Sequence, residues 1–180
     1  MYLFGIFLQM TLYFTSDQHW GHSRIIDFCN RPFASVHEMN VALTDNWNSV
    51  VKKEDTVYHL GDFCFGNPKP YLEKLNGKII LIRGSHDKRI KCFPEVHDLF
   101  TIRPKNDITI VLCHYCLRTW DKSHFNSWHL YGHSHGKLPS IGKSHDVGVD
   151  CNNFTPISLD QIIEIMKTKE DNPNLIKKTK

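Results

Sequence analysis

The sequence lacks a long hydrophobic run, an excess of charge of one sign and a framework of closely spaced cysteines. No apolar stretch approaches the roughly 20 residues that a membrane-spanning helix needs, so we expect no membrane association. Lys plus Arg number 22 against 19 Asp plus Glu, a net charge of +3. This balance gives no strong signal for nucleic-acid binding. Internal repeats and low-complexity segments are also missing, so the 180 residues are expected to form one domain.

The cysteines are expected to be unpaired thiols in a reducing, cytoplasmic compartment. Cys113 and Cys116 form a CxxC, but there is no second pair to complete a zinc site. Residues 1–9 are apolar but lack the basic region and cleavage site of a signal peptide. They are interpreted as an N-terminal extension before Met10, or as a first strand lengthened backwards. Residues from about 168 to 180 form a polar tail that is expected to fray.

The order of the predicted elements indicates an α/β fold. Short β-branched and apolar runs predict strands, and apolar residues at helical spacing after a capping residue predict helices. We expect strands at 11–15, 56–60, 78–83, 96–102, 108–113, 128–132 and 146–150, and helices at 22–29, 35–52, about 70–75 and 158–166. Strands and helices alternate at first and strands dominate later, which predicts a parallel-rich half followed by a more antiparallel half.

Histidine is unusually frequent, with 12 residues in the chain. Neutral imidazole is the commonest metal ligand in proteins. Five short motifs follow predicted strands, where open α/β sheets place their sites: DQH at 17–19, GD at 61–62, GSHD at 84–87, His114, and GHSH at 132–135. This mixture of imidazole and carboxylate fits two divalent cations, with Mn, Fe, Ni, Co or Zn favoured over Mg or Ca.

The spacing within the motifs supports this interpretation. Residues two apart on an extended segment face the same way, so Asp17 can act together with His19, and His133 with His135. A single histidine after a strand is more often structural than a ligand. Five such motifs in series favour a metal site over a set of unrelated structural histidines.

The series of motifs resembles the signature DxH, GD, GNHD, H and GHxH of calcineurin-like metallophosphoesterases. The resemblance runs from about Thr11 to Ile165, and three stretches are similar to a compact subfamily common in bacteria and phages: TSDQHWGHSRIIDFCNRPF, VYHLGDF and LNGKIILIRG. It implies a four-layer αββα sandwich, in which two mixed β-sheets are flanked by helices.

The resemblance also implies a role for each motif residue. Asp62 would bridge two metals, with the other ligands divided between them: Asp17, His19 and His135 at the first ion, and Ser85, His114 and His133 at the second. His86 would stabilise the transition state or donate a proton, and Asp87 would orient His86.

One position departs from the family pattern, because Ser85 stands where the family has Asn. In the family, the amide oxygen of that Asn ligates the second metal. A serine hydroxyl is shorter and is a weak neutral ligand. We therefore expect weaker binding of the second metal and slower turnover, by the roughly 10- to 100-fold typical of lost site partners.

These features predict a phosphodiesterase that uses two divalent ions, most readily Mn, to activate a bridging water for attack on phosphorus. The expected partner is a phosphoester substrate, nucleotide-like or generic. The alternatives are a phosphomonoesterase or protein phosphatase, a nuclease acting on nucleic-acid ends, and a catalytically impaired binding or scaffold protein. The native metal, the oligomeric state and the preference for diester or monoester stay open.

Further candidates for substrate contact are His22, Arg24 and Arg31. For His22, a capping or packing role is the favoured interpretation. For the two arginines it is solvation at the surface, although Arg offers a bidentate fork to phosphate. Three aromatic residues precede the GHSH motif and are expected either to pack in the fold or to stack on a nucleobase: Trp120, Phe125 and Trp128.

Overall fold

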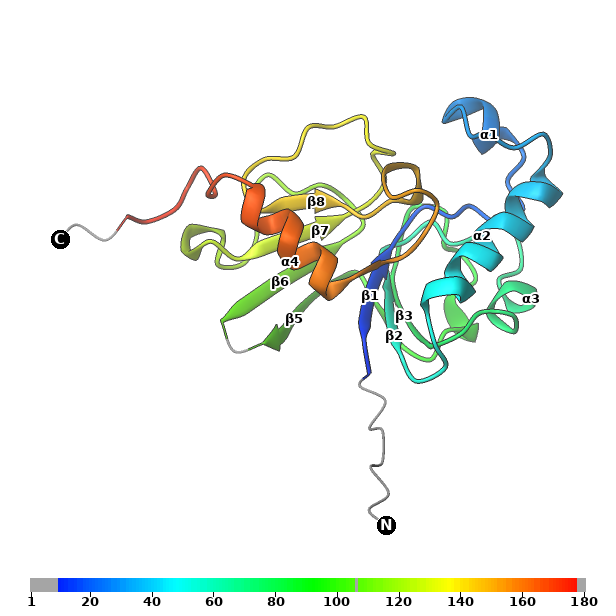
Figure 1. Ribbon diagram of the computed structural model, residues 1–180, viewed down its shortest axis with the longest axis horizontal. Helices are drawn as coiled ribbons and strands as arrows, with labels where there is room; N and C mark the ends of the chain where they lie inside the picture. Colours follow the sequence, from blue (N-terminus) through cyan, green and yellow to red (C-terminus); the bar gives the residue numbers. More distant parts are fainter. Residues whose placement is uncertain (1–9, 106, 178–180) are drawn as a thin grey trace, which may run out of the picture.

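The computed structural model describes residues 10–105 and 107–177, which form two stacked β-sheets with helices (Figure 1). The expected extension at 1–9 lies outside the described residues. The strands are β1 (Leu12–Thr15), β2 (Thr56–His59), β3 (Lys78–Ile82), β4 (Val96–His97), β5 (Leu99–Lys105), β6 (Ile108–Cys113), β7 (Trp128–Tyr131), β8 (Ser144–Asp146) and β9 (Ile157–Ser158). The helices are α1 (Arg24–Phe28), α2 (Val36–Val50), α3 (Lys69–Leu72) and α4 (Leu159–Thr168).

The first sheet has the order β4-β3-β2-β1-β9, and only β9 runs antiparallel to its neighbour. Its central strands are apolar on both faces, as expected for a parallel sheet that is covered on both sides. On one face, α2 packs Met39, Leu43 and Trp47 against Val57 and Leu81. This helix begins at a capping serine, Ser35, whose hydroxyl accepts a hydrogen bond from the amide of Glu38 at 3.1 Å.

The second sheet has the order β5-β6-β7-β8, with β5 antiparallel to β6 and the other pairs parallel. A second apolar cluster fills the space between the sheets and joins Phe14 and Ile82 of the first sheet to Leu112 and Leu130 of the second. Helix α4 packs Ile162 and its neighbours into the same cluster. The expected α/β class with two mixed sheets and helices is therefore confirmed.

Three details of the expected strand pattern differ from the structure. The segment 96–102 is two strands, because the chain passes at Asp98 from β4 in the first sheet to β5 in the second. The strand expected at 146–150 lies earlier, as β8, and is followed by a 3-10 turn at Val149–Cys151. The two-residue strand β9 was not expected, because its length is too short for any periodic signal.

The part of the tail that the structure describes is anchored, contrary to the expectation that it frays. Asn172 is only 3% exposed. Its side-chain amide donates to the carbonyl oxygens of Ser123 and Ser127, at 3.0 and 2.9 Å. Further on, the amide of Ile176 donates to the carbonyl of His124 at 3.0 Å. Within 10–105 and 107–177, no helix combines the length and the apolar character that crossing a bilayer requires.

Candidate metal centre

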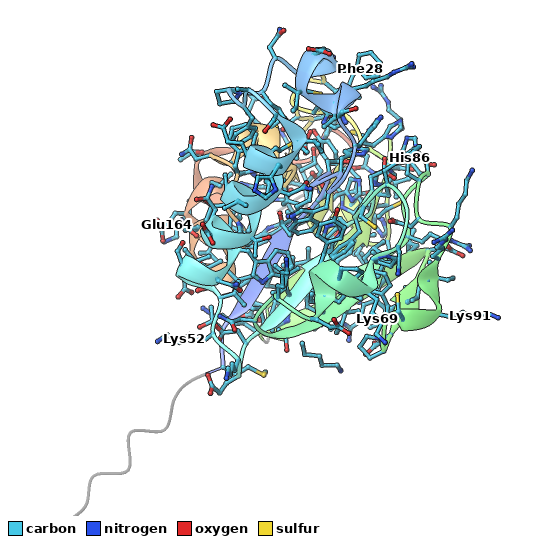
Figure 2. All side chains as sticks on the ribbon, turned by 90° about the vertical axis from the view of Figure 1, so that its right-hand side faces the viewer. Phe28, Lys52, Lys69, His86, Lys91 and Glu164 are labelled. Atoms are coloured by element: carbon cyan, nitrogen blue, oxygen red, sulfur yellow. The ribbon has the colours of Figure 1, made fainter. Side chains whose placement is uncertain are left out.

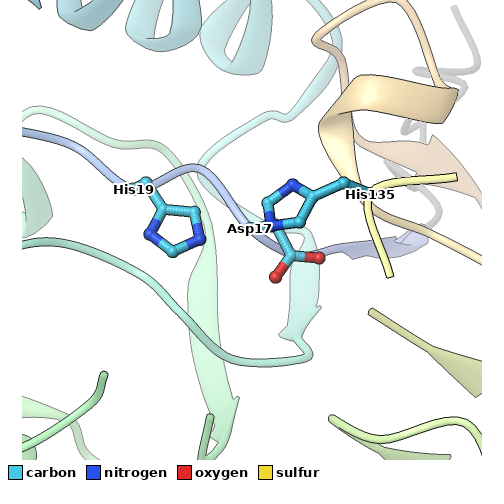
Figure 3. Close-up of side chains that lie close together, drawn as sticks. All are labelled: Asp17, His19 and His135. Carbon is cyan, nitrogen blue, oxygen red and sulfur yellow. The ribbon is translucent and has the colours of Figure 1, made fainter. Parts of the chain in front are cut away.

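The polar motifs converge at one end of the two sheets, where β1, β2, β3, β6 and β7 finish. Asp17, His19 and His135 form a first group whose potential ligand atoms all lie within 4.8 Å of one another. Figure 3 shows the ring of His135 beside the Asp17 carboxylate, with the His19 ring next to them. Two of these residues follow β1 and one follows β7, so the group joins the two sheets.

Asp62, His114 and His133 form a second group that meets the same 4.8 Å criterion. Asp62 Oδ2 lies 3.5 Å from His114 Nε2 in its own group and 3.7 Å from His19 Nε2 in the first group. One carboxylate therefore faces both groups. This is the arrangement that a ligand bridging two cations requires.

Several buried polar atoms of the first group have no hydrogen-bond partner, namely Asp17 Oδ1 and both ring nitrogens of His19. Buried polar atoms are normally satisfied, so unpaired ones call for an explanation. Burial lowers the pKa of His19 to about 3, so its ring is neutral near pH 7 and keeps a lone pair for a ligand. A cation in this group would satisfy these atoms, and the residues present therefore fit a metal.

The backbone of the candidate ligands is strained. Five of them have positive φ, a conformation that costs a non-glycine residue about 1–2 kcal/mol: Asp17 at 61°, His19 at 54°, Asp62 at 55°, His133 at 65° and His135 at 47°. Strain of this kind collects at functional sites, where the surrounding fold enforces it.

Two of the histidines are oriented by groups behind them. His114 Nδ1 donates to the Leu60 carbonyl oxygen at 2.7 Å, which leaves Nε2 to face Asp62. His135 Nδ1 lies 2.7 Å from Asp150 Oδ2, so its Nε2 is the free nitrogen. Such partners fix the tautomer and the ring orientation of metal-binding histidines.

The two candidate carboxylate ligands differ electrostatically. Burial raises the pKa of Asp17 to about 6, against the lowering effect of His135 and His114. Burial also disfavours the charge on Asp62, but His114 and the amide of His86 hold its pKa well below the usual range. Asp62 is therefore ionised throughout the neutral range, as a bridging ligand must be.

The GSHD loop lies over Asp62. Ser85 Oγ donates to Asp62 Oδ2 at 3.2 Å, and the amide of His86 donates to Asp62 Oδ1 at 2.8 Å. The exposed His86 ring lies 5.5 Å from the His19 ring. Ser85 is exposed and adjoins the second group through Asp62.

The structure assigns Asp87 a different contact from the expected one. Its carboxylate accepts from the amides of Asp62, Phe63 and Gly84, at 2.8, 2.9 and 2.8 Å. The side chain thus ties the loop after β2 to the loop after β3, instead of orienting the His86 ring. It supports the backbone on which Asp62 and His86 are placed.

Arg31 is not a surface residue, so the favoured interpretation of it as a solvated side chain is wrong. It is buried, and its Nε and Nη2 bind the two carboxylate oxygens of Asp150, each at 2.8 Å. Nη2 also donates to the Asp17 carbonyl at 2.6 Å, and Nη1 to the Gln18 carbonyl at 2.8 Å. Arg31 thus fixes both the backbone of the DQH motif and the partner of His135.

Asp150 is a site residue that the sequence analysis missed. The signal that could have found it is its position at the end of the expected strand 146–150, where the other motifs also follow strands. Cys29, His135 and Asp150 themselves lie within 4.8 Å of one another. Because Arg31 already occupies both oxygens of Asp150, we assign Asp150 as the group that orients His135.

The remaining candidates divide between the site and the surface. His22 is half-buried, with its ring 5.5 Å from that of His19. Arg24 is exposed on α1. Figure 2 places His86 and the exposed Phe28 of α1 toward the same end of the molecule, with Lys52 toward the opposite end.

The aromatic residues before the GHSH motif do not form a wall over the site. Trp120 lies 5.2 Å from the buried His129 ring, and its Nε1 donates to the Ser127 carbonyl at 3.1 Å. Trp128 packs against the cluster between the sheets. The packing interpretation is confirmed for these two residues, whereas Phe125 is exposed beside His124.

No protein-family model matches the chain. Its two-sheet fold overlaps with the structure of a protein of unknown function, AQ665 from Aquifex aeolicus, with a TM-score of 0.71 and 28% identity, covering 87% of this chain and 100% of that one. A "predicted phosphoesterase" from Streptococcus pneumoniae TIGR4 overlaps with a TM-score of 0.39 and 19% identity, covering 77% of this chain and 71% of that one.

The sequence comparison adds a relative of nearly the same extent. The chain is 37% identical over 168 residues to the uncharacterized protein MJ1445 of Methanocaldococcus jannaschii. The match covers 87% of this chain and 91% of that protein. The chain therefore belongs to the same protein family as MJ1445.

Proposed function

We propose that this protein is a calcineurin-like metallophosphoesterase that binds two divalent metal ions and hydrolyses phosphodiester bonds. The observation that carries the proposal is the position of Asp62, whose Oδ2 lies 3.7 Å from His19 Nε2 and 3.5 Å from His114 Nε2. Two sets of imidazole and carboxylate ligands that share one carboxylate are the donor arrangement of a dinuclear hydrolytic centre.

The first ion would be held by Asp17, His19 and His135, and the second by His114 and His133, with Asp62 shared. The imidazole-rich donor set favours Mn, Fe, Co, Ni or Zn over Mg or Ca, and we propose Mn as the first ion to test. Two such ions supply positive charge for the phosphoryl oxygens and lower the pKa of a bound water.

His86 is the residue that this chain offers to the substrate. The His86 amide donates a hydrogen bond to Asp62 Oδ1 at 2.8 Å, and the His86 ring is exposed beside His19. From this position, the ring can donate a hydrogen bond to a phosphoryl oxygen or a proton to the leaving oxygen. Asp87 contributes by fixing the loop that carries His86.

The test combines metal counting with hydrolysis. Bis(p-nitrophenyl) phosphate and p-nitrophenyl phosphate are supplied with Mn to the wild type, to Asp62→Asn, and to Glu164→Gln as a control at an exposed position of α4 (Figure 2). We expect two bound ions in the wild type and faster hydrolysis of the diester. Asp62→Asn should lower both metal content and rate, the rate by about 100-fold or more, because both ions lose a shared ligand.

Each other outcome has a definite meaning. A wild type that binds no metal at saturating Mn would favour a scaffold that keeps the fold without catalysis, and would overturn the proposal. Faster hydrolysis of the monoester would reassign the protein as a phosphomonoesterase. An Asp62→Asn rate equal to that of Glu164→Gln would show that the measured activity does not come from this centre.

A further inference from the structure

An aromatic ledge borders the metal centre and is defined by Phe28, His22 and Phe65. The two phenylalanines are large apolar residues left open to solvent, 61% and 59% exposed. The His22 ring is stacked on Phe65, with centroids 4.9 Å apart and an interplanar angle of 16°. It meets Phe28 edge-on, with centroids 6.5 Å apart. Exposed aromatic groups that lie together in this way mark contact sites.

The ledge leads directly to the proposed reaction site. The ring centroid of His22 lies 5.5 Å from that of His19, a candidate metal ligand, and 6.3 Å from that of His86. A planar group stacked on the ledge would therefore lie close enough to a phosphoryl group at the metal centre for both to be parts of one ligand. This location distinguishes Phe65 from the exposed Phe125, whose ring lies beside His124. Tyr115, which is also exposed, borders the other ligand group, with its ring 4.9 Å from those of His114 and His133.

The Phe65 backbone is fixed, so the ring is presented in a defined place. Its amide donates to the carbonyl of Trp20 at 2.8 Å, and Trp20 pairs with Cys64 in a parallel bridge. The Trp20 side chain is fully buried and stacks on Tyr71. Because this segment is already ordered, binding a ligand to Phe65 requires little loss of conformational entropy.

A cavity of about 210 Å³ opens between Phe65 and the loop that carries His86. Phe65, Cys64 and Phe93 supply apolar lining, while His86, Lys88 and Arg89 supply polar and charged lining. Among the described residues, Lys88 and Arg89 make no ion pair with a carboxylate. The volume is below that of a pocket for a whole drug-sized ligand, and it suits one ring system of a larger anionic ligand.

We propose that Phe65 is a base-stacking platform, and that the substrate is a nucleotide-type phosphoester. Its base stacks on Phe65 while its phosphoryl group meets the metal centre. Every nucleobase has a flat face that stacks on an aromatic ring. The free charges of Lys88 and Arg89 favour the phosphate-bearing part of such a ligand. The catalytic part of this inference rests on the proposed phosphoesterase function, whereas the binding part rests only on the metal centre of that proposal and not on turnover.

Binding is tested first and without turnover. Isothermal titration of the Mn-loaded protein with AMP and with ribose 5-phosphate isolates the contribution of the base. We expect AMP to bind at least about 5- to 10-fold more tightly, given the usual strength of base stacking on an aromatic ring. Phe65→Leu should remove this difference, and Phe65→Trp should keep it.

Phe125→Leu is the matched control, because Phe125 is also exposed but lies in the 3-10 turn Ser123–Phe125, which contacts the C-terminal segment. It should leave the preference for AMP unchanged. Equal affinities of the wild type for AMP and ribose 5-phosphate would overturn the inference. A Phe65→Leu variant that still prefers AMP would overturn it as well.

Hydrolysis then separates this inference from the proposed function. Thymidine 5′-(p-nitrophenyl phosphate) and methyl p-nitrophenyl phosphate share a leaving group, and the second carries a methyl group in place of the nucleoside. Phe65→Leu should raise KM about 5- to 10-fold for the nucleoside ester only, with little change in kcat. An equal rise in KM for both esters would indicate that the shared p-nitrophenyl leaving group stacks on Phe65, and it would overturn the inference. Base-dependent AMP binding without hydrolysis of either ester would support the platform and count against the proposed activity.

Discussion

Arg31 and Asp150 form a buried bidentate ion pair, with the Nε and Nη2 atoms of Arg31 each 2.8 Å from a carboxylate oxygen of Asp150. The same carboxylate lies 2.7 Å from His135 Nδ1. The pair therefore connects the chain after α1 to a candidate metal ligand after β7. His135 is oriented from behind by a carboxylate that is itself held in place.

Asp150→Asn is expected to weaken metal binding by the first group. The amide would hold His135 less firmly and would lower the basicity of its Nε2, which typically costs about 10- to 100-fold in affinity. Calorimetric titration with Mn measures the effect. Asp160→Asn at an exposed position of α4 is the control, and thermal unfolding of both variants confirms that the folded protein is being compared. Equal Mn affinity in Asp150→Asn and wild type would remove Asp150 from the site.

Ser85→Asn is expected to strengthen the second metal site. Ser85 Oγ lies 3.2 Å from Asp62 Oδ2, and the longer amide side chain adds a stronger oxygen ligand there. Mn affinity and diester turnover should rise about 10- to 100-fold. Ser85→Ala serves as the comparison: unchanged turnover in Ser85→Asn together with a loss in Ser85→Ala would show that the hydroxyl already does the work of a ligand.

The metal-free protein is expected to lose stability as the pH falls below about 6.5. Gly61 N donates to His59 Nδ1 at 3.2 Å, and His59 Nε2 faces Gln18 Oε1, so the buried ring is held neutral. Burial lowers its pKa to about 3. Between that value and the unfolded value near 6.5, the unfolded state binds the proton and the folded state does not.

Each such histidine removes about 1.4 kcal/mol of stability per pH unit across this window. Burial lowers the pKa of His19 to about 3 as well, so it acts in the same direction. Urea unfolding with chelator present, between pH 4.5 and 7, should show a shallower pH slope for His59→Gln than for wild type. Identical slopes would mean that His59 is not held neutral in the folded protein.

Mn is expected to raise the thermal stability of the chelator-treated protein. The unpaired atoms of Asp17 and His19 gain a partner only when a cation binds. At a metal concentration about 100 times Kd, this linkage stabilises the folded state by about 2.7 kcal/mol. The rise in Tm that Mn causes should be smaller in Asp62→Asn than in the wild type. In Glu164→Gln it should equal the rise in the wild type. A Tm that does not respond to Mn in the wild type would contradict the metal assignment.

The sequence analysis could predict that the five motifs lie together, because their signal is local. DQH, GD, GSHD, His114 and GHSH each follow a strand whose apolar run is visible in the sequence, and parallel strands bring such ends together. The structure brings all of these motifs to one end of the two sheets.

Long-range contacts could not be predicted in the same way. The Arg31–Asp150 pair joins residues 119 apart, and neither residue lies in a motif that signals the other. Asp87 was placed near the site, but its hydrogen bonds to the Asp62 and Phe63 amides depend on how two loops meet. The aromatic ledge was missed for a similar reason, because His22 and Phe65 come from different loops.

The crossing from β4 to β5 has a consequence for the spacing of the two candidate ligand groups. Only Asp98 separates His97, which pairs with Ile82 in the first sheet, from Leu99, which pairs with Cys113 in the second. A rotation of one sheet against the other would break one of these pairings. The covalent chain thus ties the two sheets together at the end where both ligand groups lie, and cations of different radius would have to adapt to one preset gap between these groups.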